Sequence, residues 1–158
     1  MMSRIYHWFL LSAGITLGMT GAAKIVSAFG HAKILLLVDP IFSLQFRSLL
    51  PLVGSLELCG AIVCFVNRDI LVRACLVGWF GVGFLAYRTG LEIIHYPRPC
   101  SCLGSMASAL GLSADTASNI MKVVLVYLLV GSLSVLAGVC YDRVRRNSRY
   151  VSASRGSV

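Results

Sequence analysis

Apolar residues run along this chain in four long stretches, separated by shorter and more polar segments. The stretches lie near residues 6–26, 49–66, 70–89 and 120–141. Each approaches the roughly 20 apolar residues that a helix needs to cross a bilayer. Backbone groups in lipid must be hydrogen-bonded internally, which leaves helices or a closed β-barrel. The period-2 alternation typical of barrel strands is absent from the sequence, so the stretches should be helices. The pattern predicts an all-α, polytopic membrane protein: one domain, built as a bundle of four transmembrane helices.

Composition agrees with this prediction and excludes one class of function. The chain has 158 residues, of which 58% are hydrophobic and 13% charged, and this is too apolar for an ordinary soluble domain. The formal net charge of +8 would suit a nucleic-acid-binding protein. However, five arginines crowd behind the last apolar stretch: Arg143, Arg145, Arg146, Arg149 and Arg155. That placement is typical of the positive-inside bias of membrane proteins, so the expected partner is the lipid bilayer and not nucleic acid.

The basic tail, residues 142–158, also sets the expected orientation. With this tail in the cytoplasm and four spans, the N-terminus with Arg4 is cytoplasmic as well. The tail itself is expected to fray. The segment between the first two spans, His31–Pro51, then faces outward, and we expect it to cap the bundle. A cleaved signal peptide is the alternative for the N-terminus, because small residues at Thr20–Ala23 resemble a cleavage site. The apolar run before them is long for a signal peptide.

The outer segment between the third and fourth spans carries the most specific feature of the chain. Cys100 and Cys102 are one residue apart, with Pro97 and Pro99 before them and Gly104 behind. A bent three-residue segment can bring two Cα atoms within disulfide distance, and so small a ring would be strained and easily exchanged. Outward placement puts the thiols in an oxidising compartment. We therefore predict that Cys100 and Cys102 are the catalytic pair of a thiol–disulfide oxidoreductase.

Other interpretations of the pair remain open. His95 with the two cysteines offers three ligands suited to copper or zinc, although the spacing matches no standard zinc pattern and no fourth ligand is evident. The bond could equally be a structural staple in a membrane subunit or assembly factor that performs no turnover. The other four cysteines, Cys59, Cys64, Cys75 and Cys140, lie among apolar neighbours and are expected to pack as small hydrophobes.

Charged side chains inside the spans are a second signal, because they are costly in lipid and mark functional sites. Lys24 and Glu57 fall at comparable depth in the outer half of the bilayer, so we expect them to pair. Arg88, His95 and Lys122 follow on the same side of the membrane. Together these five residues are predicted to line and tune a pocket below the cysteine pair. The alternative is a purely structural ion pair, with Arg88 and Lys122 extending to the headgroups.

These motifs resemble those of a known family. The segments Gly21–Lys24 and Leu50–Pro51, with Glu57, resemble the DoxX-like membrane proteins. Arg88, followed by the run Cys100–Gly104 and a closing helix, is similar to the MauE branch, the methylamine-utilisation membrane proteins. The resemblance covers about residues 5–140. This chain departs from the usual motif in having Ser101 for a common glycine and Leu103 for an aromatic residue.

The resemblance implies a four-helix protein of the cell inner membrane that is linked to thiol–disulfide chemistry outside the cytoplasm. MauE itself is associated with maturation of a disulfide-rich periplasmic protein, so a disulfide-containing extracytoplasmic partner is implied. DoxX relatives include a subunit of a thiosulfate:quinone oxidoreductase, and a quinone is thus a candidate electron carrier. By this likeness Cys100 and Cys102 would be the redox pair, and Lys24 and Glu57 the intramembrane charges.

Overall fold

The structure, a computed structural model, describes residues 2–30, 33–95 and 114–155. Four of its helices are long and apolar enough to cross a membrane, which confirms the prediction of an all-α four-helix bundle. A short 3₁₀ helix, η1, lies between the first two. In chain order the elements are α1 (Met2–Ala28), η1 (Lys33–Leu36), α2 (Phe46–Val66), α3 (Ile70–Ile93) and α5 (Ala114–Arg155).

Three of the long helices extend a little beyond the apolar stretches that predicted them. α1 begins at Met2, α2 at Phe46, and α3 continues to Ile93. α2 encloses Pro51, which the sequence analysis had placed at the start of the second span. Proline has no backbone N–H, so one bond of the first turns of α2 is missing. The missing bond is the one to the carbonyl of Arg47, four residues before Pro51. The carbonyl of Pro51 itself accepts the hydroxyl of Ser55 at 2.7 Å.

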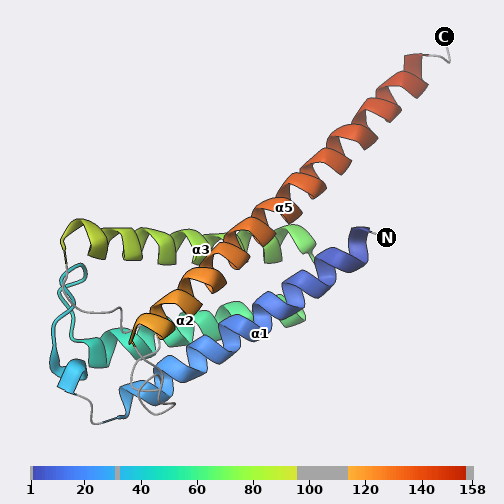
Figure 1. Cartoon of the computed structure of the whole chain (residues 1–158). Helices are drawn as coiled ribbons and strands as arrows, with labels where there is room; N and C mark the ends of the chain where they lie inside the picture. Colours follow the sequence, from blue (N-terminus) through green and yellow to red (C-terminus); the bar gives the residue numbers. More distant parts are fainter. Residues whose placement is uncertain (1, 31–32, 96–113, 156–158) are drawn as a thin grey trace.

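The basic tail does not fray as expected. α5 continues through it to Arg155, and its C-terminal half projects beyond the other helices in Figure 1. The sequence explains this, because neither glycine nor proline occurs between Val139 and Gly156. Arginine is a good helix former, and basic residues near a helix C-terminus interact favourably with its dipole. The part of α5 that is apolar enough to cross a membrane is Asn119–Arg145.

The four long helices form two pairs. α1 packs along α2, and α3 packs along α5, whereas contacts between the pairs are sparse. The first pair is close because glycines face each other: a Cβ at Gly54 would lie 2.7 Å from the carbonyl oxygen of Gly21. Only glycine allows so close an approach of two helix backbones.

The two ends of the bundle differ in character. The N-terminus, the C-terminal end of α5 and the short α2–α3 turn lie at one end, here called the terminal end, and the longer connections lie at the other, the loop end (Figure 1). The buried apolar cluster extends toward the terminal end: Leu10, Ala13, Leu17, Ala61, Cys64, Ala74, Val77, Leu128 and Val135. Both cavities and the buried side chains of Lys24, Asp39 and Glu57 lie toward the loop end, and they form the candidate site.

Candidate functional site

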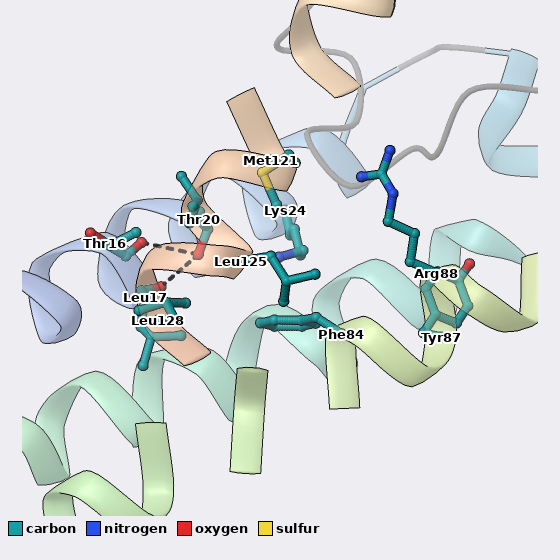
Figure 2. Close-up of a pocket in the computed structure, with 11 residues that line it drawn as sticks. Thr16, Leu17, Thr20, Lys24, Phe84, Tyr87, Arg88, Met121, Leu125 and Leu128 are labelled. Atoms are coloured by element: carbon teal, nitrogen blue, oxygen red, sulfur yellow. Dashed lines mark hydrogen bonds between the residues drawn. The ribbon is translucent and has the colours of Figure 1, made fainter. Parts of the chain in front are cut away.

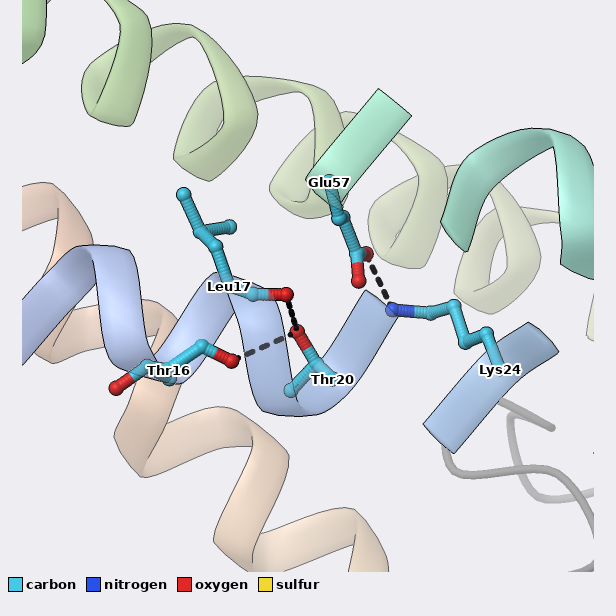
Figure 3. Close-up of polar contacts among 5 residues, drawn as sticks. All are labelled: Thr16, Leu17, Thr20, Lys24 and Glu57. Carbon is cyan, nitrogen blue, oxygen red and sulfur yellow. Dashed lines mark hydrogen bonds and ion pairs between the residues drawn. The ribbon is translucent and has the colours of Figure 1, made fainter. Parts of the chain in front are cut away.

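Lys24 of α1 and Glu57 of α2 form a buried ion pair near the loop end. The ammonium of Lys24 donates to Oε1 of Glu57, as predicted from their similar depth (Figure 3). Glu57 is 0% exposed and Lys24 is 4% exposed. The local sequence permits this contact, because Gly21 and Gly54 bring the two backbones together one turn away. A Cβ at Gly21 would lie 3.0 Å from the Cβ of Glu57.

The surroundings of the pair leave it electrically neutral but incompletely hydrogen-bonded. Oε2 of Glu57 is buried and has no hydrogen-bond partner among the described residues. The nearby hydroxyl of Thr20 donates to backbone carbonyls of its own helix, those of Thr16 and Leu17, at 3.0 and 3.2 Å (Figure 3). The ammonium of Lys24 also lies 5.2 Å from the ring centroid of Phe84, a cation–π distance.

A cavity of about 340 Å³ lies between α2 and α3, beside this ion pair. Lys24 contributes the one charged side chain of its lining. Aliphatic side chains of α2 line one wall, and most of the remaining surface is aromatic. The aromatic residues are Phe42, Phe46, Trp79, Phe80, Phe84 and Tyr87. The cavity occupies part of the loosely packed gap between the two helix pairs.

A second, smaller cavity of about 50 Å³ lies on the other side of Lys24 (Figure 2). It is enclosed by α1, α3 and α5, and its lining includes Arg88 and Met121. Lys24, Phe84 and Tyr87 line both cavities, so they form the partition between them. Arg88 and Lys122 were both predicted to tune the pocket, but only Arg88 lines the small cavity. Lys122 is exposed on α5.

The remaining predicted site residues lie at the edge of this region. Arg88 is mostly buried, and its Nε lies 3.9 Å from Oε1 of Glu92, one turn further along α3. His95 is exposed, directly after the end of α3, and has a positive φ of 49°. The structure therefore brings Lys24, Glu57 and Arg88 together, with His95 at the end of the same helix as Arg88.

Cys100 and Cys102 lie outside the described residues. They belong to residues 96–113, which connect His95, beyond the end of α3, to Ala114, the first residue of α5. Within the described part of the chain, no three His, Cys, Asp or Glu side chains are grouped so that they could hold a metal. Of the four other cysteines only Cys64 is buried, so the expectation that all four pack in the core is wrong for Cys59, Cys75 and Cys140.

Sequence analysis missed Asp39, which organises the loop between α1 and α2. Asp39 is 0% exposed. Its Oδ1 accepts the backbone N–H groups of Ile41 and Phe42 at 2.8 and 2.9 Å, and its Oδ2 accepts the hydroxyl of Tyr87 from α3. The Asp39-Pro40 dipeptide is nevertheless a typical signal for a turn in which the aspartate caps its own backbone.

The same turn completes the large cavity. Phe42 stacks on Tyr87 with ring centroids 5.9 Å apart and an interplanar angle of 19°. Because Asp39 holds both the backbone of Phe42 and the hydroxyl of Tyr87, it fixes two walls of the cavity at once. The prediction that this loop caps one end of the bundle thus gains a mechanism.

A buried cation at the terminal end was also missed. Arg73, in the first turns of α3, is 4% exposed, and its Nη1 lies 3.4 Å from Nδ1 of His7. Its Nε and Nη2 atoms have no hydrogen-bond partner in the described ranges. The sequence offered one signal, a charged residue inside a span, which sequence analysis did not apply to Arg73.

Comparison with known proteins adds no family assignment. No family model, no curated protein and no solved structure matches the chain.

Proposed function

We propose that this protein is a thiol–disulfide oxidoreductase of the inner membrane, in which Cys100 and Cys102 exchange electrons with an extracytoplasmic protein. Both termini are cytoplasmic in this proposal, and the partner is a periplasmic protein that acquires disulfides. The resemblance to MauE and DoxX-like proteins supports it. The structural observation that supports it most concerns the two helices that flank the cysteine segment. Both α3 and α5 line the small cavity that contains Lys24 and Arg88.

The proposed reaction is a thiol–disulfide exchange through a mixed disulfide. A thiolate of the partner attacks one sulfur of the Cys100–Cys102 disulfide, the S–S bond breaks, and the other cysteine leaves as a thiolate. A second partner thiolate then attacks the mixed disulfide. The partner gains a disulfide, and the cysteine pair gains two electrons and, on protonation, two protons. A lipid-soluble carrier of the quinone class then accepts two electrons and two protons and becomes a quinol, while the disulfide is restored.

The cations near the flanking helices suit this chemistry. A thiolate is the nucleophile and the leaving group, and positive charge nearby favours it over the thiol. Arg88 lies at the loop end of α3, twelve residues before Cys100 in the sequence. Lys24 is paired with the buried Glu57, whereas Glu92, the acidic neighbour of Arg88, is largely exposed. Arg88 is therefore the residue of the small cavity that we expect to favour the thiolate. Lys24 and Glu57 instead join α1 to α2 at the loop end.

Trapping of the partner tests the proposal. In native membranes, the Cys100→Ser and Cys102→Ser variants each retain one thiol of the pair. One of these variants should accumulate a mixed disulfide with a periplasmic protein. The adduct should disappear on reduction and in the double-serine variant. A structural staple predicts no adduct from either single variant. A metal site predicts copper or zinc that co-purifies with the protein and is lost in the double-serine variant. Either of these results, in place of an adduct, would overturn the proposal.

A further inference from the structure

We propose that the cavity between α2 and α3 is a binding site for a neutral, lipid-soluble molecule with a flat ring and a ring-borne oxygen, and that Lys24 donates a hydrogen bond to that oxygen. The ligand's role as electron carrier rests on the proposed function. Its binding does not, because neither cysteine of the pair is among the residues that form the cavity.

The shape and lining of the cavity indicate the ring. Six aromatic side chains contribute to its walls. Two pairs of them are stacked, Phe42 on Tyr87 and Phe80 near Phe84, the latter with centroids 6.0 Å apart. Flat aromatic surfaces of this kind favour a planar guest. The volume of about 340 Å³ is at the lower end of the range typical of small-molecule sites, which suits a ring system rather than a whole phospholipid.

Lys24, the one charged side chain of the lining, indicates that the ligand carries an oxygen and no charge. An ammonium has three N–H donors, and the hydrogen bond to Glu57 uses one of them. The side chain therefore retains donor capacity where it lines the cavity. Because the carboxylate of Glu57 cancels its charge, the site has little attraction for a phosphate or another anion. A carbonyl or hydroxyl oxygen on a neutral ring satisfies the donor without adding charge to a buried place.

The route of entry indicates that the ligand is lipid-soluble. α2 and α3 pack sparsely against each other. Two lining residues on these helices are open at the surface, with Leu56 54% exposed and Trp79 78% exposed. Both lie well inside stretches that are apolar enough to span a membrane, so the cavity opens toward the hydrocarbon of the bilayer. A ligand would enter laterally from the lipid.

One glycine provides a clean way to close the cavity. Gly83 of α3 belongs to the lining, and a Cβ added there would meet no atom within 4 Å. The Cβ of Gly83→Leu would therefore displace no neighbour, and we expect the rest of the side chain to occupy the cavity. Val82→Leu is the matched control, because Val82 is the adjacent, 57% exposed residue of the same helix and is not part of the lining. For the donor, Lys24→Met combined with Glu57→Gln removes the ammonium without leaving an unpaired charge.

Fluorescence of Trp79 can report the binding directly. The chain has two tryptophans, so Trp8→Phe leaves Trp79 as the one emitter. The full-length protein, with Cys100→Ser and Cys102→Ser to remove the redox pair, is placed in phosphatidylcholine nanodiscs and titrated with 2-methyl-1,4-naphthoquinone. We expect saturable quenching, retained by Val82→Leu and abolished by Gly83→Leu. The Lys24→Met/Glu57→Gln variant should weaken binding by about tenfold, as expected for loss of one charge-assisted hydrogen bond.

Three results would overturn the inference. Quenching that rises linearly in every variant would show only partition of the probe into lipid. Saturable quenching that Gly83→Leu leaves unchanged would place the binding elsewhere. Quenching of Trp79 by brominated phosphatidylcholine that the naphthoquinone does not relieve would assign the cavity to a lipid acyl chain. Because these proteins lack the cysteine pair, binding without any partner adduct in the trapping experiment would sink the proposed function and leave this site intact.

Discussion

The hydroxyl of Tyr87 in α3 donates a hydrogen bond to the buried carboxylate of Asp39, and this bond joins the α1–α2 loop to the second helix pair. The buried apolar cluster joins the two pairs toward the terminal end, and this bond joins them through the loop at the other end. The other carboxylate oxygen binds two backbone N–H groups of the turn. One side chain therefore stabilises the loop and attaches it to α3.

Removing this attachment should loosen the loop end. Asp39→Ala leaves the two backbone donors and the Tyr87 hydroxyl without their acceptor, so we expect a loss of about 2–4 kcal/mol in the free energy of unfolding. Tyr87→Phe removes only one of these bonds and should cost about 1 kcal/mol. Unfolding in mild detergent, followed by circular dichroism, measures both. Equal losses from the two variants would contradict the assignment of the turn to Asp39.

The Lys24–Glu57 pair should show strong coupling. Lys24→Met alone strands a fully buried carboxylate, and such losses typically cost about 3–5 kcal/mol. Lys24→Met with Glu57→Leu removes both charges and should recover most of that loss, because well-packed apolar groups often replace a buried pair at little cost. A double-mutant cycle on unfolding free energies measures the coupling. Additive effects of the single changes would mean that the two side chains do not interact.

Close contact of α1 and α2 should depend on Gly54. In Gly54→Ala the new Cβ would lie 2.7 Å from the Gly21 carbonyl oxygen, so the helices must move apart. We expect destabilisation of about 1–3 kcal/mol, as in other overpacked cores. Gly83→Ala is the control: its Cβ meets open space, and alanine favours the helix by up to about 1 kcal/mol. Opposite shifts of the melting temperature are predicted for the two variants, and a shared direction would contradict this packing.

The sequence predicted the parts of the fold that depend on one helix at a time. The four spans follow from apolar length, because lipid leaves an isolated segment few other conformations. The Lys24–Glu57 contact followed from depth alone, since both residues lie at similar distances from the loop end. The prediction that the basic tail frays was wrong, because it took account of the charge of the tail and not of its lack of glycine and proline.

The large cavity and the Asp39–Tyr87 bond could not be predicted in this way. Both depend on which helices are neighbours and on how the α1–α2 loop folds back, and hydropathy carries neither kind of information. The sequence places Trp79 and Tyr87 in the third span but does not indicate what they pack against. Their role in one cavity becomes visible only when α2 and α3 lie beside each other.

The redox state of Cys100 and Cys102 in intact membranes tests the central proposal most directly. Membranes are equilibrated across a graded redox buffer, free thiols are alkylated, and the pair is quantified by mass spectrometry, with a membrane-impermeant reagent in a parallel sample. We predict a reversible Cys100–Cys102 disulfide that titrates at a mild potential and whose thiols react from the extracytoplasmic side. Thiols that stay reduced throughout the range, or that react only from the cytoplasmic side, would contradict the proposed function.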